Sequence, residues 1–336
     1  MTDVIKHPNL VKCFCKHYNL PINVYHGLYF AERLQVLDRI YGCIDLFNTF
    51  QKDHEKFDSE EQYFEYVSNI SKEIIQNIES KPSFVRLMSD ESMIDSINHN
   101  DDSITLAQIR SQYKNIELYT AENDGYNFVS IDMNKANFSS LRCFSGSIFD
   151  SKTSWERFVG EFTDVRHLQS SRYFRQYIFG ECCPKILPKI ERYIMGNILN
   201  KIVSVLPEWK QYVYSLNNDE ILFKIPDIDL KTISIMVKSF DPIFKTVVGG
   251  DAVRVKCFKL CKVHGTTGYM KHYHDGNVEY KCFDQTTLIQ VIRYWDNEPI
   301  SPIDLTFVHN GRLARYEEPI ENPWKEKSDA ETEQKC

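Results

Sequence analysis

The chain has 336 residues, of which 42% are hydrophobic and 26% charged, and this composition excludes a largely disordered protein. The formal net charge of −7 counts against a protein dedicated to nucleic-acid binding, because such proteins are usually basic. The sequence begins without an apolar signal segment and has no run of about 18 apolar residues, so we expect neither secretion nor a membrane span, and a cytoplasmic location.

Residues 1–115 are predicted to form a helical domain. Apolar side chains recur at helical spacing from His26 to Phe50 and again from Tyr63 to Ile78. Ser80-Lys81-Pro82 is expected to end the second of these helices. The polar stretch 90–102 is expected to form a loop.

The periodicity changes to that of strands after residue 115. Ile116–Thr120 and Tyr126–Met133 are predicted strands, joined by a hairpin turn at Asn123-Asp124-Gly125. A short helix is expected from Asn134 to Phe144. The segment Thr153–Glu156 has the pattern of a capping box, which indicates the start of another helix.

Long helices are then expected up to about Val205, followed by a hairpin made of Tyr212–Leu216 and Ile221–Ile225. Asp229 is expected to cap the next helix. Three further strands are predicted at 253–263, 268–273 and 278–283.

Without the helical insertion, the elements from Tyr126 onward follow the order β-α-β-β-α-β. This order predicts an α+β fold with a ferredoxin-like sheet. In such a sheet the end of the first strand lies beside the tip of the hairpin. We therefore expect Asp132 and Asp219, which are distant in the sequence, to share one site.

Asp132, Asp219 and Glu220 are candidate catalytic residues, with Asp132 and Asp219 as the metal ligands. Nucleotidyl transfer uses two divalent ions about 3.5–4 Å apart, and Mg²⁺ prefers carboxylate oxygens. Each feature also has a plainer interpretation: Asp132 as a helix cap, and Asp219-Glu220 as ordinary turn residues. The predicted topology, which brings them together, favours the metal site.

These segments resemble motifs of palm-domain nucleic acid polymerases. Ser130–Leu141 looks like motif A, a strand-end aspartate followed by a helix. Val213–Pro226 resembles motif C of family A DNA polymerases, whose core reads His-Asp-Glu, with Asn218 in place of the histidine. Arg172–Gly180 resembles the fingers helix of that family, although Glu181 follows Gly180 where the family ends in Tyr-Gly.

The resemblance implies a nucleotide site beside the carboxylates. Arg172 and Arg175 would bind phosphates and Phe179 would stack on the incoming base. Asn137 or Phe138 would contact the sugar, although Phe138 could equally be a core aromatic. The implied nucleotide-binding residues are Arg172, Arg175, Gln176, Phe179, Phe138 and Asn137.

The strands after motif C loosely resemble the lysine-rich hairpin with which family B polymerases hold the primer. Together with the basic stretch from Arg166 to Lys201, this implies nucleic-acid contacts by Lys185, Lys259, Lys271 and Lys281. The only acidic residues of that stretch are Glu181 and Glu191. The basic stretch is equally compatible with the solvated faces of long helices.

Six cysteines and histidines near the C-terminal strands have spacings within the loose range of zinc sites; they are Cys257, Cys261, His264, His272, His274 and Cys282. Free cysteine is commonly a buried apolar residue, and the ten cysteines lack a regular framework. Core packing is therefore favoured over zinc.

The sequence thus predicts four parts. These are a helical domain (1–115), a palm (116–250) with a fingers-like insertion (151–206), a β-rich region (251–320) and an acidic disordered tail (321–336). The predicted function is Mg²⁺- or Mn²⁺-dependent, two-ion addition of nucleotides to a primer 3′-hydroxyl, most similar to template-dependent DNA synthesis. The expected partners are primer–template, nucleoside triphosphates and an accessory replication protein, and this function implies the nucleoid or a viral replication compartment as the alternative to a cytoplasmic location. The alternative is a catalytically inactive, polymerase-like module that binds nucleic acid or protein.

Overall fold

One six-stranded antiparallel sheet forms the centre of the protein. The computed structural model describes residues 8–25, 27–89, 113, 116–226, 228–249, 251–310 and 312–324. These residues form both helices and strands, and the six strands of the main sheet are antiparallel, which confirms the predicted α+β class. The predicted loop at 90–102, and the predicted disordered tail beyond residue 324, lie outside the described residues.

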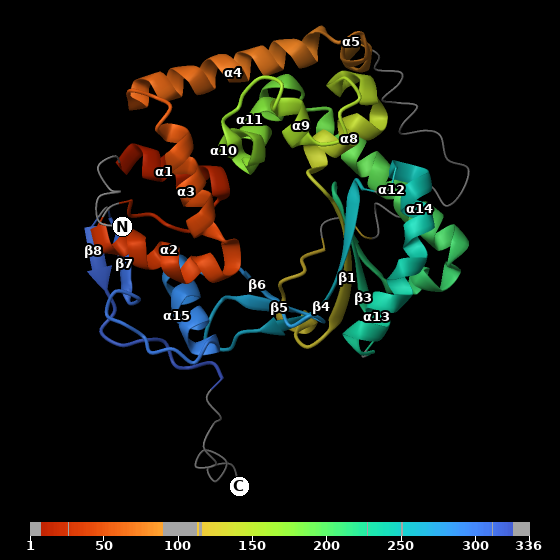
Figure 1. Cartoon of the computed structure of the whole chain (residues 1–336). Coiled ribbons are helices and arrows are strands. Elements are labelled where there is room, and N and C mark those ends of the chain that lie inside the picture. Colours follow the sequence, from red (N-terminus) through yellow and green to blue (C-terminus); the bar gives the residue numbers. More distant parts are fainter. Residues whose placement is uncertain are drawn as a thin grey trace.

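The N-terminal part is helical, as predicted. Its helices are α1 (Pro8–Tyr18), α2 (Gly27–Tyr41), α3 (Cys43–His54), α4 (Glu60–Ser80) and α5 (Pro82–Ser89). The single helix expected from His26 to Phe50 is interrupted at Gly42, whose φ of 56° is left-handed and suits glycine. Figure 1 shows these helices as an arc that runs from the last strands of the chain to the helices above the sheet.

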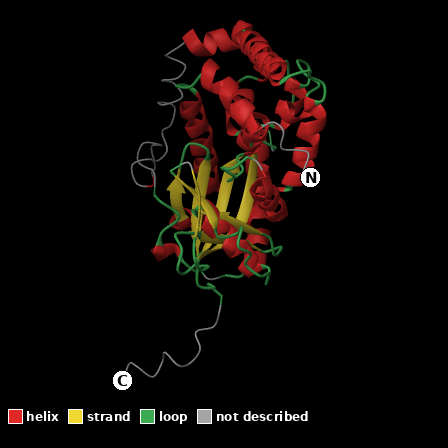
Figure 2. Cartoon of the chain, turned by 90° about the vertical axis from the view of Figure 1, so that its left-hand side faces the viewer, coloured by secondary structure: helices red, strands yellow, loops and turns green. Residues whose placement is uncertain are grey.

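The strands are β1 (Asn127–Met133), β2 (Val213–Leu216), β3 (Glu220–Ile225), β4 (Val253–Lys262), β5 (Tyr269–Tyr273) and β6 (Val278–Lys281). Their order is β2-β3-β1-β4-β5-β6, and every neighbouring pair is antiparallel. The strands lie together below most of the helices (Figure 2). Because residues Val253–Lys259 of β4 pair with the whole of β1, the strands on both sides of the expected boundary at residue 250 belong to one sheet.

The strand expected at 116–120 does not form. These residues bend into a short 3₁₀ helix, η2 (Ala121–Asn123), so the predicted hairpin is absent. The turn itself remains: Gly125 has a φ of 78°, and its amide donates to the carbonyl of Leu260 on β4. This segment therefore enters the sheet beside β4 without adding a strand.

Between β1 and β2 the chain forms α8 (Ala136–Phe144), η3 (Gly146–Phe149), α9 (Trp155–Val159), α10 (Arg166–Ser170), α11 (Arg172–Cys182), α12 (Leu187–Val205) and η4 (Pro207–Tyr212). The cap of α9 is Ser154, one residue after the predicted Thr153. Asp229 caps the next helix as predicted, accepting from the amides of Lys231 and Thr232.

The helices after β3 are α13 (Leu230–Met236), η5 (Val237–Phe240) and α14 (Asp241–Val248), and the chain continues after β6 with α15 (Gln285–Trp295), β7 (Thr306–His309) and β8 (Arg312–Arg315). In the described part of the chain, no helix combines the length and apolarity that crossing a membrane would need.

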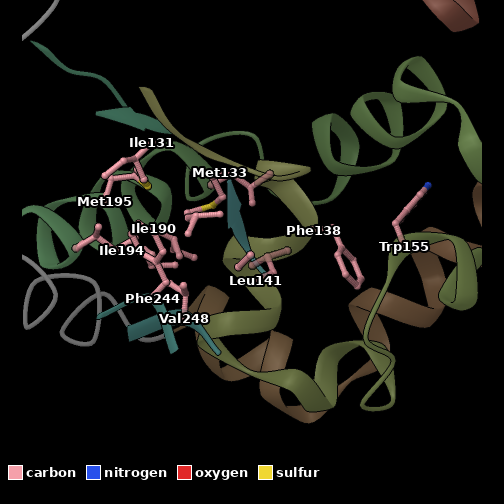
Figure 3. Packing of buried hydrophobic residues seen from close by; sticks show 14 of the residues in the cluster. Ile131, Met133, Phe138, Leu141, Trp155, Ile190, Ile194, Met195, Phe244 and Val248 are labelled. Atoms are coloured by element: carbon pink, nitrogen blue, oxygen red, sulfur yellow. The ribbon is translucent and has the colours of Figure 1, made fainter. Parts of the chain in front are cut away.

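Helices cover one face of the sheet and make the main core there. Val129, Ile131 and Met133 of β1 alternate onto this face and pack with residues of α8, α12 and α14. Figure 3 shows Ile131 and Met133 within this cluster. Ser130 and Asp132 point to the opposite face. The buried helical face therefore fixes the register that leaves the polar side chains of β1 on the other side.

Candidate active site

Three acidic residues, Asp132, Asp219 and Glu220, lie near one another where β1 ends and the chain turns between β2 and β3. In the sheet register Asp132 lies directly opposite Glu220, so both side chains are on the same face. The amide of Met133 donates to the carbonyl of Asp219 at 2.8 Å. The predicted juxtaposition of Asp132 with Asp219-Glu220 is therefore present in the structure.

These carboxylates are partly buried and repel one another. Burial and then the charge of Asp132 raise the pKa of Asp219, against an opposing effect of Arg172. Burial raises the pKa of Glu220, while a hydrogen bond from Ser130 Oγ at 2.6 Å and the charge of Lys271 lower it. Incompletely compensated negative charge is a common feature of cation and catalytic sites.

Asp132 has a cationic partner. The guanidinium of Arg254 on β4 donates from Nε (2.9 Å) and Nη2 (2.8 Å) to the same oxygen, Oδ2. The Arg254 side chain is 56% exposed, so its charge is well solvated and free to move. Asp132 Oδ1 forms no hydrogen bond among the described residues.

A fourth carboxylate, Glu191, is added by α12 and was missed at the level of sequence. Burial, and then the charge of Asp219, raise the pKa of Glu191 to about 7. Next to it, Arg192 donates from Nε (3.0 Å) and Nη2 (2.7 Å) to Asn218 Oδ1, which fixes the turn that carries Asp219. The signal was present in the sequence: Glu191 falls between Leu187 and Ile194 on the apolar side of its helix.

The residues of α11 divide into exposed and buried sets. Arg172 and Gln176 line a pocket of about 380 Å³ between α11 and α1. Arg175 is only 8% exposed, and burial lowers the pKa of its guanidinium. Its position favours a role inside the protein over the predicted contact with phosphate.

The two aromatic residues predicted at the nucleotide site are core residues. Phe179 is fully buried, with its ring 5.4 Å from that of Trp155, so no ring face is open to a base. Phe138, which Figure 3 shows in the buried cluster, is 2% exposed. The centroid of its ring lies 4.6 Å from that of Phe149. This burial argues against stacking by Phe179 and favours the core alternative for Phe138. Asn137 is partly exposed on the first turn of α8.

The predicted nucleic-acid-binding lysines do not share one surface. Lys271 lies on the face of the sheet that carries Asp132, but it is only 7% exposed and its Nζ is 4.3 Å from the ring centroid of Phe258. Lys281 is on the same face and pairs with Glu279 at 3.2 Å. Lys259 pairs in register with His272 and points to the other face, while Lys185 is exposed before α12. Only Lys271 interacts electrostatically with the acidic site, through Glu220.

The candidate zinc ligands are not brought together. Cys257 belongs to the helix-side core, and burial raises the pKa of its thiol to about 11. His264 and Cys282 are exposed. Among the described residues, no three His, Cys, Asp or Glu side chains are arranged to hold one ion. The burial of Cys257 in the core agrees with the preference for core packing at this residue.

Asp132 and Asp219 are nevertheless a donor set that suits Mg²⁺. That ion commonly takes one or two protein carboxylates and completes its shell with water and substrate phosphates. Both residues offer hard oxygen ligands, Asp132 near the end of β1 and Asp219 in the turn between β2 and β3, and burial and the charge of Asp132 raise the pKa of Asp219. Glu220 is held by Ser130 and would be an auxiliary group.

A buried hydrogen-bond network joins α3, α4 and α10. Asp53 Oδ2 accepts from the amide (2.9 Å) and Nδ1 (3.1 Å) of His167, whose Nε2 is 2.8 Å from Tyr63 Oη. Burial lowers the pKa of His167, so the neutral ring accepts from the tyrosine hydroxyl. This network ties the N-terminal helices to the segment that leads into α11.

Ser171→Ala is expected to destabilise the fold by about 1–3 kcal/mol. Ser171 caps α11 by accepting from the amide of Phe174 at 3.0 Å, and its hydroxyl is 2.6 Å from Nδ1 of buried His17. Urea unfolding checks this, with Ser154→Ala as control, since Ser154 caps α9 through Arg157 alone. An equal loss in both variants would contradict a role for the link to His17.

No family model matches the chain, and no curated protein matches it.

Proposed function

We propose that this protein is a palm-type nucleotidyltransferase that adds nucleotides to a primer 3′-hydroxyl with divalent cations held by Asp132 and Asp219. The observation that carries the proposal is the meeting of Asp132 with Asp219-Glu220 at one edge of the sheet. Template-dependent DNA synthesis is the proposed reaction.

The connectivity supports this proposal. Strands β1 to β4 lie in the order β2-β3-β1-β4 with antiparallel neighbours, which is the order that a β-α-β-β-α-β path produces. With α9–α12 as the insertion, the proposal assigns Asp132 to motif A and Asp219-Glu220 to motif C. Glu191 adds a further acidic group from the helix that follows the fingers-like α11.

Bound divalent cations would supply charge neutralisation and activation of the attacking hydroxyl. Asp132 and Asp219 would hold and space those ions, while Asn218, fixed by Arg192, keeps the hairpin turn in place. Arg172 would orient the phosphates from the start of α11. The protein's contribution is then mainly positioning and electrostatic preorganisation.

Extension of a labelled primer–template tests the proposal. Wild-type protein with Mg²⁺ or Mn²⁺ is expected to extend the primer, and Asp132→Asn is expected to reduce the rate by about 10²-fold or more. Asp45→Asn, at an exposed position on α3, is the matched control and should extend normally. Absence of extension by the wild type with every nucleotide set and both metals would contradict the proposal.

A non-catalytic nucleic-acid-binding module is the second candidate. The observation that favours it is that Arg254 already satisfies one oxygen of Asp132, and Ser130 satisfies Glu220. In that case the arginine would be a permanent structural partner of the carboxylate.

Arg254→Gln distinguishes these two candidates. If Asp132 is a metal ligand, removing the competing guanidinium is expected to tighten Mn²⁺ binding about fivefold, because an exposed ion pair contributes up to about 1 kcal/mol. Electron paramagnetic resonance of free Mn²⁺ measures this affinity, with exposed Arg312→Gln as control. Unchanged or weaker binding in Arg254→Gln would favour the structural pair.

A further inference from the structure

A compact cationic pocket lies between the N-terminal helix α1 and the start of α11. It has a volume of about 380 Å³, within the usual range of small-ligand sites. The lining includes the cations Lys12, Lys16 and Arg172 and the amides Asn19 and Gln176. None of the lining residues is acidic.

The three cations of this pocket are Lys12, Lys16 and Arg172. In the described part of the chain, no acidic side chain forms an ion pair with any of them. Lys16 Nζ lies 4.2 Å from the ring centroid of Tyr173, which positions the ammonium without removing its charge. Three cations without an ion-pair partner around one small pocket favour a ligand with several negative charges.

Arg172 relates the pocket to the proposed function. It lines the pocket at the first residue of α11. If Arg172 orients the phosphates of a nucleotide, as proposed above, phosphates that extend beyond it would enter the pocket that Lys12 and Lys16 complete. Extended nucleic acid would instead need a continuous basic groove, whereas this pocket is confined to α1, α11 and the segment after α1.

We propose that Lys12 and Lys16 form, with Arg172, a subsite for the terminal phosphates of a nucleoside triphosphate. This inference rests on the proposed nucleotidyltransferase function. It gives the N-terminal helical part a direct role in substrate binding, with α1 supplying two cations to a site whose carboxylates come from the sheet.

Calorimetric titration of the full chain with inorganic tripolyphosphate tests the subsite separately from catalysis. Lys12→Gln/Lys16→Gln is expected to bind at least about tenfold more weakly than wild type, because hydrogen bonds to charged groups are among the strong ones. The control is Lys52→Gln/Lys72→Gln, which removes the same charge from exposed positions on α3 and α4 and should bind normally. Thermal unfolding verifies that both double variants are folded.

The outcomes separate this inference from the proposed function. If tripolyphosphate binds wild type and control but not Lys12→Gln/Lys16→Gln, the subsite stands, even where no primer is extended. Equal binding by the two double variants, or no binding by wild type, would overturn it, even where primers are extended. If Lys12→Gln/Lys16→Gln binds tripolyphosphate like the wild type but binds a single-stranded oligonucleotide more weakly, the proposal is also overturned. The pocket would then bind a nucleic-acid strand.

Discussion

Asp219→Asn is expected to abolish primer extension, with a loss of about 10²–10³-fold or more, while making the protein more stable. The rate falls because the variant loses a proposed metal ligand and the electrostatic environment that comes with it. Stability rises because Asp219 has a raised pKa through burial and the charge of Asp132. A carboxyl group of this kind disfavours folding once the pH exceeds its unfolded pKa, and asparagine removes that charge.

The two halves of this prediction are measured together, by extension kinetics and by thermal unfolding without divalent ions. Asp45→Asn again serves as control, since this exposed side chain on α3 should change neither property. An inactive Asp219→Asn that is also less stable would mean that the residue holds the hairpin together. Full activity of the Asp219→Asn variant would show that Asp219 takes no part in the reaction.

Glu191→Gln is expected to stabilise the fold at pH 8 by roughly 2–3 kcal/mol and to have little effect near pH 4.5. Burial raises the pKa of Glu191 from 4.5 to about 7, with Asp219 adding to the shift. As the pH rises, the Glu191 carboxyl loses its proton at a lower pH in the unfolded chain than in the folded protein. The free energy of unfolding of the wild type therefore falls between about pH 4.5 and 7. Above pH 7 Glu191 is ionised in both states, and the loss of stability no longer grows.

Urea unfolding at several pH values in the presence of a chelator measures this dependence. Glu181→Gln, at an exposed position on α11, is the matched control and should follow the wild type. A Glu191→Gln variant that loses stability at pH 8 would show that the ionised carboxylate is favourably paired.

The sheet and its acidic edge could be predicted because both depend on local patterns. Alternating apolar residues define β1, β3 and β4, and their connectivity brings Asp132 to Asp219. The helix break at Gly42 depends on a left-handed backbone angle, which periodicity does not report. Ile116–Thr120 has a strand-like composition but lacks a strand partner, so its intrinsic preference is not realised.

The side chains of α11 show where the sequence was insufficient. A resemblance to the fingers helix indicates which residues are present but not how the helix is rotated against its neighbours. Packing against Trp155 buries Phe179, and the same rotation buries Arg175 while it exposes Arg172 and Gln176. Glu191 was missed for a related reason, since its importance depends on Asp219, which is remote in sequence.

A crystal structure of the protein with Mn²⁺ and a nucleoside triphosphate analogue, with the metal located by anomalous scattering, would test whether Asp132 and Asp219 hold divalent ions. We predict anomalous density between the carboxylates of Asp132 and Asp219, with the guanidinium of Arg254 displaced from Asp132. Saturating Mn²⁺ without density at these carboxylates, and with the Arg254–Asp132 pair intact, would contradict metal binding by Asp132 and Asp219.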